Sequence, residues 1–160
     1  MAPQSHRELT LAGRAPTLDD LVPYLMNRIV SRLNQNLADK LRSRRLTFQH
    51  WRVLAVLYRR DGQTLSQLVE WTVIPQSTLS RLIDRMAGAR LVVRKPARRA
   101  DSRFIEVWLT EKGREVYEEI VPLALGEHDA ALKGLDAEQV AALAATLRRV
   151  MHNLGIGPAV

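Results

Sequence analysis

One amphipathic segment, residues 76–86, constrains the fold more than any other part of the chain. Four apolar side chains recur in it at the i, i+3, i+4 and i+7 spacing of one helix face: Leu79, Leu82, Ile83 and Met86. At about 100° per residue, polar residues such as Arg81 and Asp84 fall on the opposite face. A short helical pattern at 64–71 precedes it, followed by a turn at 73–75. Two short helices joined by a tight turn are typical of a helix-turn-helix whose second helix enters the major groove of DNA.

The pattern then changes from helical to β. Residues 91–93 and 104–109 are rich in β-branched and aromatic side chains and predict two strands. The turn between them is basic, and its residues expected to act on DNA are Arg98, Arg99, Asp101 and Arg103. A hairpin with a cationic tip suits the narrow minor groove of A·T-rich DNA, where the negative potential is deepest. The alternative is a charged hairpin that is simply solvated.

Positive charge is concentrated in the same part of the chain. Residues 76–114 hold ten Lys or Arg against four Asp or Glu, which gives +6, whereas the whole chain carries +7. Residues 1–75 carry +5, from eleven basic and six acidic residues, and residues 115–160 carry −4, from three and seven. This asymmetry favours a polyanion as the partner of the central segment.

Long helices are predicted on both sides of this module. The first is expected over 18–42 behind a cap at Thr17, and the second begins after Thr47. Another follows the second strand as far as residue 132, and the last begins at Asp136. The terminal helices carry apolar seams that are expected to form a dimer interface: Leu18, Leu21, Leu25, Val140, Leu143, Leu147, Val150 and Leu154. Packing of the last helix against the first within one chain is the alternative.

These elements predict a mainly α fold with a small β-wing, in which a winged helix-turn-helix is flanked by N- and C-terminal dimerisation helices. The expected DNA-binding domain is 46–113, and the helical dimerisation region is 17–45 together with 114–154. Flexible tails are expected at 1–16 and 155–160, where prolines and glycines lie outside the helical patterns.

Several classes of function are disfavoured. The chain has no cysteine, which excludes disulfides, thiolate catalysis and cysteine zinc sites. No nucleophile elbow, phosphate-binding loop, dinucleotide fingerprint or zincin helix is present, and the four histidines are too scattered to predict a metal site. We therefore expect no catalytic residues, no metal and no cofactor. Without a signal peptide or an apolar run of about 20 residues, we expect a cytoplasmic protein with no membrane partner.

The chain resembles the multiple-antibiotic-resistance regulator (MarR) family of bacterial winged-helix regulators over about residues 18–154. The motifs that carry the resemblance are Leu46-Thr47, Trp51-Arg52-Val53-Leu54, Ser77-Thr78-Leu79-Ser80-Arg81-Leu82, Arg94, Asp101-Ser102-Arg103 and Leu109-Thr110-Glu111-Lys112-Gly113. Their order and spacing together make it specific. The resemblance implies a homodimer with interleaved termini that binds a pseudo-palindromic operator and is often released by a small aromatic acid. It also implies that Asp101 shapes the wing and that Arg103 touches the DNA.

Six residues of the predicted recognition helix are expected to contact DNA: Gln76, Ser77, Thr78, Ser80, Arg81 and Arg85. Arg81 is the strongest candidate for reading a base, because its planar fork matches the two acceptors of guanine. The alternative for Arg81 is a surface salt bridge with Asp84. Asp84 itself is expected to orient an arginine, since a carboxylate close to phosphates is otherwise unfavourable.

A second group of residues is expected where the first helix, the second helix and the helix after the wing meet: Tyr24, Arg28, His50, Trp51 and Arg52. An arginine or histidine would pair with a carboxylate while the aromatic side chains stack on a ring, which suits a small aromatic carboxylate or phenolic effector. The alternatives are a core tryptophan and a partly buried structural histidine. We therefore expect a sequence-specific repressor released from its operator by such an acid. An architectural DNA-binding protein of low specificity, and a repressor or activator without a ligand, stay open.

Overall fold

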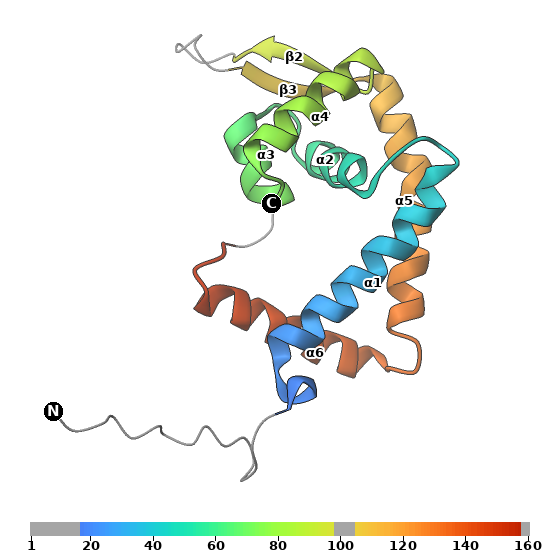
Figure 1. The fold of residues 1–160 in the computed structure, drawn as a ribbon, viewed down its shortest axis with the longest axis vertical. Coiled ribbons are helices and arrows are strands. Elements are labelled where there is room, and N and C mark those ends of the chain that lie inside the picture. The colour runs from blue at the N-terminus through green and yellow to red at the C-terminus, as the bar shows by residue number, and fades with distance from the viewer. Residues whose placement is uncertain (1–16, 98–104, 158–160) are drawn as a thin grey trace, which may run out of the picture.

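The computed structural model describes residues 17–97 and 105–157 (Figure 1). Its elements are a 3-10 turn η1 (Leu18–Asp20), α1 (Val22–Arg42), α2 (Phe48–Arg59), β1 (Gln63–Thr64), α3 (Leu65–Thr72), α4 (Gln76–Gly88), β2 (Val92–Pro96), β3 (Ile105–Leu109), α5 (Glu111–Ala131) and α6 (Ala137–Asn153). The predicted class, mainly helical with a small β-wing and flanking terminal helices, is confirmed.

The core lies where α2, α3 and α4 pack against the sheet and the first half of α5. All four apolar residues of the predicted α4 stripe are fully buried in it, together with Leu54 and Leu57 of α2. Ile120 of α5 is also fully buried. Because this packing buries the apolar side of α4, the polar side of the helix faces the solvent.

The sheet has three antiparallel strands in the order β1–β3–β2, one more than the sequence predicted. Val92 to Pro96 of β2 pair with Leu109 to Ile105 of β3, and Gln63 of β1 pairs with Val107 on the other edge of β3. The missed strand is two residues long. It has no alternating pattern of its own and exists only because β3 lies beside it.

The first helix begins later than predicted. Residues Leu18–Asp20 form a 3-10 turn capped by Thr17, whose backbone N–H donates to Asp20 Oδ2 at 2.8 Å. Leu21 is extended (φ −90°, ψ 107°), and α1 starts at Val22. Pro23 explains the break, because a proline has no backbone N–H to donate and is tolerated in the first turn of a helix and not further in.

At the end of α6 the helix is closed by residues assigned above to the C-terminal tail. The Ile156 N–H donates to the Met151 carbonyl and the Gly155 N–H to the His152 carbonyl, with Gly155 at φ +70°. This is a Schellman cap, in which glycine takes the left-handed position without steric cost. Gly155 and Ile156 are therefore part of the helix end.

The winged helix-turn-helix occupies one end of the molecule, and α6 with the start of α1 occupies the other (Figure 1). The connection is made by α1 and α5, which pack side by side. Glu127 of α5 accepts Lys40 Nζ at 2.6 Å and Asn36 Nδ2 at 2.8 Å, both from α1. None of the helices in the described ranges has the length and hydropathy needed to cross a membrane.

Candidate nucleic-acid interface

The outer face of α4 is a solvent-facing polar surface. Gln76, Ser77, Arg81 and Arg85 are exposed, and Thr78 and Ser80 are half-buried. The start of this helix also differs from those of α2, α3, α5 and α6, where a Thr or Asp side chain accepts a backbone N–H of the first turn. The N-cap of α4 is Pro75, which provides no such acceptor. The first-turn N–H groups of α4 are thus available to a phosphate oxygen.

The turn between α3 and α4 is set by Thr72 and Arg52. The buried Thr72 hydroxyl donates to the Leu68 carbonyl at 2.6 Å, and Arg52 Nη1 donates to the Thr72 carbonyl at 2.9 Å. Val73 follows in the left-handed region at φ +53°, an unfavourable conformation for a β-branched residue, and its side chain is exposed. Arg52 thus fixes the angle at which α4 leaves α3.

Asp84 on the outer face of α4 holds an arginine of the wing. Arg94 Nη2 of β2 lies 2.9 Å from Asp84 Oδ1, and the same nitrogen donates to the Ser80 carbonyl at 3.5 Å. The expectation that Asp84 orients an arginine is met by Arg94. The salt bridge considered above for Arg81 is not formed, and Asp84 pairs with Arg94 instead. Arg81 makes no ion pair with any described residue, and its guanidinium is available to a ligand.

The wing carries further cations on its strands. Lys95 of β2 is exposed and its Nζ lies 5.4 Å from the centre of the Trp108 ring of β3, a cation–π contact that keeps the ammonium on the sheet surface. The predicted tip residues Arg98, Arg99, Asp101 and Arg103 lie outside the described residues.

A second set of contacts fastens the end of α4 to the start of α5. The Thr110 hydroxyl donates to the Arg90 carbonyl at 2.5 Å, its N–H donates to the Leu91 carbonyl at 3.1 Å, and Lys112 Nζ donates to the Ala89 carbonyl at 3.1 Å. Gly113 lies so close to the backbone of Leu91 that a Cβ added to the glycine would be 2.0 Å from the Leu91 carbonyl oxygen. These contacts hold the end of α4 against the start of α5.

Asp61 has a structural role that the sequence did not reveal. Its Oδ1 accepts the Leu109 N–H at 2.8 Å and its Oδ2 accepts Arg114 Nη2 at 2.6 Å. The carboxylate thus joins the end of α2 to β3 and α5. The partners lie 48 and 53 residues away in the chain, a separation that no local pattern reports.

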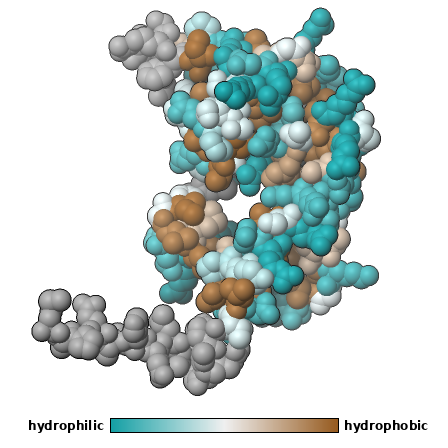
Figure 2. All heavy atoms as spheres, in the orientation of Figure 1, coloured by the Kyte–Doolittle hydropathy of each residue, from teal (hydrophilic) through white to brown (hydrophobic). Residues whose placement is uncertain are grey.

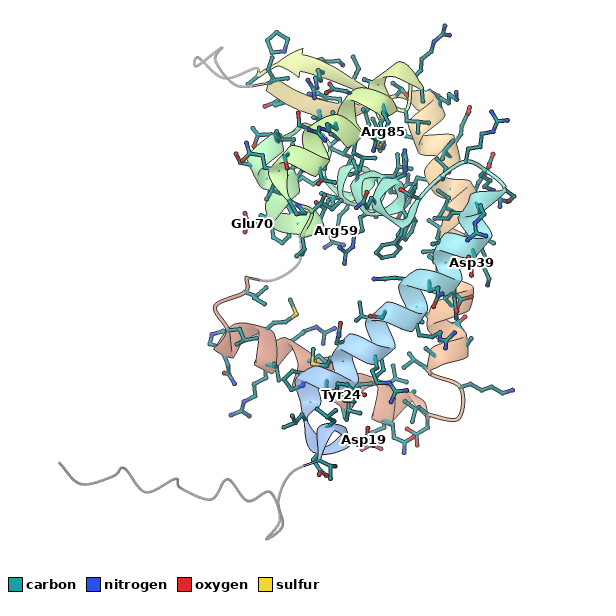
Figure 3. The ribbon with its side chains drawn as sticks, in the orientation of Figure 1. Asp19, Tyr24, Asp39, Arg59, Glu70 and Arg85 are labelled. Atoms are coloured by element: carbon teal, nitrogen blue, oxygen red, sulfur yellow. The ribbon has the colours of Figure 1, made fainter. Side chains whose placement is uncertain are left out.

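The five residues predicted to bind an effector do not form one cluster within the chain. Tyr24 and Arg28 contact each other, with the guanidinium 5.8 Å from the ring centre. They lie near the start of α1, about 20 Å (Tyr24) and about 14 Å (Arg28) along the helix from Leu37, where α1 enters the core. Figure 3 places Tyr24 at the end of the molecule opposite Arg85 of α4. Arg52 is committed to Thr72 and to the Phe48 ring, 4.9 Å away.

The remaining two predicted effector residues belong to the packing around α2. The Trp51 ring stacks on Tyr117 of α5 at 5.2 Å between centroids, and Tyr117 stacks on Tyr58 at 4.1 Å. Burial, followed by the neighbouring Tyr58 phenol, raises the pKa of Tyr117. Trp51 is therefore part of an aromatic stack that joins α2 to α5.

His50 caps its own helix. Its Nδ1 accepts the Thr47 N–H at 3.1 Å, while Thr47 Oγ1 accepts the His50 N–H at 3.4 Å. Burial and then the nearby Arg85 lower the pKa of His50, which favours the neutral imidazole. With Nδ1 acting as an acceptor, the proton of the neutral ring is on Nε2.

The terminal helices expose the apolar seams predicted for dimerisation. The exposed fractions are 61% for Leu18, 39% for Leu25, 44% for Leu143 and 71% for Leu154. Leu21 is 40% exposed, and Val140, Leu147 and Val150 are half-buried. Not one residue of α6 is fully buried. Figure 2 shows apolar side chains on this half of the surface, over α6 and the start of α1.

Comparison with known proteins agrees with this geometry. A model of the MarR family matches residues 46–103, which span α2 to the wing. The transcriptional repressor IacR of Pseudomonas putida is 29% identical over 136 residues, covering 85% of this chain and 81% of that protein.

Two solved structures extend the likeness. Bordetella bronchiseptica BpsR, whose DNA binding is regulated by 6-hydroxynicotinic acid, superposes with a TM-score of 0.74 at 27% identity over 84% of this chain and 96% of that one. A MarR-family transcriptional regulator from Silicibacter pomeroyi reaches a TM-score of 0.79 at 36% identity, over 86% of this chain and 92% of that one. Identity at this level over almost the whole of both chains goes beyond a shared fold, and the chain belongs to the MarR family of DNA-binding transcriptional regulators, which are not enzymes.

Proposed function

We propose that this protein is a homodimeric repressor that reads a pseudo-palindromic operator with α4 in the major groove and is released from it by a small aromatic acid. The observation that carries the proposal is the free guanidinium of Arg81. It stands on an exposed polar helix face, and the carboxylate that would otherwise neutralise it, Asp84, is held by Arg94 at 2.9 Å. An unpaired arginine at this position has no structural task in the described fold.

The other residues on the outer face of α4 are proposed to make different kinds of DNA contact. Gln76, Ser77 and Thr78 lie at the uncapped start of α4, where side chains and backbone N–H groups together suit phosphate and base-edge contacts. Ser80 is half-buried and its carbonyl already accepts Arg94, so it contributes its hydroxyl alone. Arg85, one turn further along and close to His50, suits the phosphate backbone. The wing cations Arg98, Arg99 and Arg103, with Asp101 shaping the turn, would enter the adjacent minor groove.

The homodimer is supported by the state of the terminal helices. A helix of 17 residues such as α6 is marginal by itself in water, and an apolar seam normally has to be buried for it to persist. The exposed leucines of α1 and α6 lie at the same end of the molecule, far from the DNA-reading face (Figure 1). A second copy of the chain would cover both seams at once and place two recognition helices on one DNA duplex.

The dimer is tested by placing a charge in the seam. In Leu143→Glu the new carboxylate would be buried in the interface, so sedimentation is expected to show a monomer with far-UV spectra of folded protein. Ala145→Glu, also exposed but about 200° around α6 from that position, is the matched control and is expected to stay dimeric. A dimeric Leu143→Glu variant would place the interface elsewhere.

Operator recognition and release are tested together in one titration. The protein is titrated at fixed near-physiological salt against the intergenic DNA upstream of its own gene and against random duplex, with and without a panel of aromatic acids. Tight binding to the upstream DNA alone, abolished by an acid, is the expected result. Equal affinity for both duplexes would indicate an architectural protein, and selective binding unaffected by every acid would indicate a regulator without such a ligand.

The choice of effector class has support from a relative. The DNA binding of BpsR is regulated by 6-hydroxynicotinic acid, an aromatic carboxylate, and this chain resembles BpsR over 84% of its length. Within the present chain an effector of that kind needs a cation for its carboxylate and an apolar wall for its ring. Among the five predicted residues, Tyr24 and Arg28 provide a ring and a cation in contact near the start of α1, whereas His50, Trp51 and Arg52 lie on α2.

A further inference from the structure

The turn that leads into α4 contains a strained residue that its own packing does not explain. Val73 has a left-handed backbone (φ +53°, ψ +33°), which a β-branched residue disfavours, and its side chain is 77% exposed. It lies between two buried residues, Thr72 and Ile74. Residues in such conformations persist only where their surroundings enforce them, and they are frequent at functional sites. The conformation is therefore set by contacts around the valine and not by its side chain.

The peptide unit between Thr72 and Val73 is held on both sides. Its N–H donates to the Val69 carbonyl at 3.0 Å, which continues the hydrogen bonding of α3. Its carbonyl oxygen accepts Arg52 Nη1 of α2 at 2.9 Å. Carbonyls in the last turn of a helix have no partner inside that helix, so this bond satisfies a group that would otherwise need water. Arg52 thus ties the turn to α2.

Arg52 is itself held in place for this contact. Its guanidinium lies 4.9 Å from the centre of the Phe48 ring, one turn earlier on α2, and Phe48 packs against the hydrophobic core. The arginine side chain is half-buried. A planar guanidinium held on an aromatic face loses less freedom in forming a hydrogen bond than a flexible ammonium does. The position of α2 in the core is thereby transmitted to the backbone of the turn.

The geometry of this turn influences the direction in which α4 starts. The N-cap of α4, Pro75, offers no capping side chain that would align the first turn of the helix. Val73 lies two residues before it, and a change from the left-handed to another backbone conformation would redirect the chain at that point. Gln76 and Ser77, which are proposed to contact DNA, follow at once. A small change in direction would move them relative to base edges without changing the charge of the module.

We propose that Arg52 is a positioning residue for operator recognition, because its bond to the Thr72 carbonyl keeps Val73 left-handed and the start of α4 in the orientation that reads bases. The inference rests on the proposed reading of an operator by α4. It gives Arg52 a role in that reading without contact with the DNA, in place of the effector contact predicted from the sequence.

The expected size of the effect follows from the strain. For a residue other than glycine, the left-handed conformation is disfavoured roughly 5- to 30-fold. A protein that populates its binding-competent conformation only in part binds more weakly by that fraction. Without the Arg52 bond, the dissociation constant on the operator is expected to rise at least about fivefold. Binding to random duplex depends on phosphate contacts and should change much less, so the ratio of the two constants falls.

The test compares Arg52→Met with Arg59→Met, which removes the same charge from an exposed position of the same helix. Dissociation constants on the upstream DNA and on random duplex are measured by fluorescence anisotropy, with far-UV spectra and sedimentation as checks of fold and oligomeric state. Arg52→Met is expected to lose selectivity and Arg59→Met to keep it. Arg52→Lys, which retains a donor for the carbonyl, should keep most of it. Arg52→Gln takes the place of Arg52→Met if the methionine variant does not fold.

The double variant Arg52→Met/Val73→Gly separates positioning from a general structural role. Glycine adopts the left-handed conformation about as readily as the right-handed one, so the turn no longer depends on the arginine. This variant is expected to recover most of the selectivity lost in Arg52→Met. Arg52→Met/Gly126→Ala is its control, since it adds a substitution expected to stabilise α5 far from the turn, and it should recover none.

Three results would overturn the assignment: wild-type selectivity in Arg52→Met, equal losses in Arg52→Met and Arg59→Met, or a loss that Val73→Gly does not restore. With a selective wild type, any of these would leave the operator proposal intact and remove the role of Arg52 alone. Equal affinity of the wild-type protein for both duplexes would instead refute the proposed reading of an operator, and this inference with it.

Discussion

Replacement of Arg81 by alanine is the most direct test of the proposal that α4 reads DNA bases. The exposed guanidinium is not paired with Asp84, so the substitution breaks no ion pair in the described fold and leaves the buried stripe of α4 untouched. Any change in DNA affinity then comes from the protein–DNA contact and not from a weakened fold.

The magnitude follows from the number of contacts. A bidentate arginine–guanine pair contributes about 1–3 kcal/mol of discrimination. A dimer on a palindrome loses two such pairs, or about 2–6 kcal/mol, which corresponds to roughly a 30-fold to 10⁴-fold rise in Kd on the operator. On random duplex only a phosphate attraction is lost, so the ratio of the two affinities falls.

Fluorescence anisotropy at one fixed salt concentration measures both constants. Arg59→Ala, which removes the same charge from the exposed end of α2, serves as the control (Figure 3). It is expected to leave the ratio of the two dissociation constants unchanged. Operators in which each half-site guanine is replaced in turn should show one position that the Arg81→Ala protein no longer distinguishes. A loss of the same size on every duplex would refute base reading and make Arg81 a phosphate contact, with a salt slope reduced by about one per contact.

Three further predictions concern the fold. Gly113→Ala is expected to lower the free energy of unfolding by several kcal/mol in urea titrations, because its Cβ would meet a backbone oxygen at 2.0 Å. Gly126→Ala in the same helix has open space around the new Cβ and should raise the free energy of unfolding by about 0.5–1 kcal/mol. Equal effects of the two would show that α5 does not approach α4 so closely. Val73→Gly, which relieves a left-handed valine whose side chain is 77% exposed, should stabilise the protein by about 0.5–1 kcal/mol, and a loss of stability would mean that this valine packs against something. The hydrogen bonds from α1, chiefly that of Lys40, lower the pKa of Glu127. The ion pair therefore contributes stability above the unfolded-state pKa, and this contribution is lost as the pH falls through the lower folded-state value. The thermal unfolding temperature of Glu127→Gln should fall less than that of the wild type across this acidic range, and an identical pH profile for the two proteins would contradict the assignment.

The parts of the structure that the sequence predicted are those set by residues close together in the chain. The α4 stripe was readable because four apolar residues recur at helical spacing, and their burial leaves the polar face outward. The caps at Thr47 and Asp136 were readable for the same reason, since a cap and its partner lie three residues apart. The expected coupling of Asp84 to an arginine was correct, although its partner was not identified.

What the sequence could not predict is how distant segments meet around the residues proposed for an effector. Arg52 was assigned to an effector because of its neighbours in sequence, yet its guanidinium binds a carbonyl 20 residues away, at the turn before α4. Trp51 was also assigned to an effector, and in the structure its ring stacks on Tyr117 of α5, the helix after the wing. Tyr24 and Arg28 were grouped with α2 because helix order does not specify where along a 21-residue helix the next one crosses.

The bridge from Arg94 to Asp84 has a consequence for which DNA sequences suit this protein. It joins a strand of the wing to the outer face of α4, against which β2 also packs, so we expect the two parts to move together. With α4 in the major groove and the wing in the minor groove, as proposed, the distance between the two contacts would be fixed, and the DNA would have to supply the matching twist and groove width. Base pairs that the protein never touches would then influence affinity through the stiffness and shape they give to the duplex.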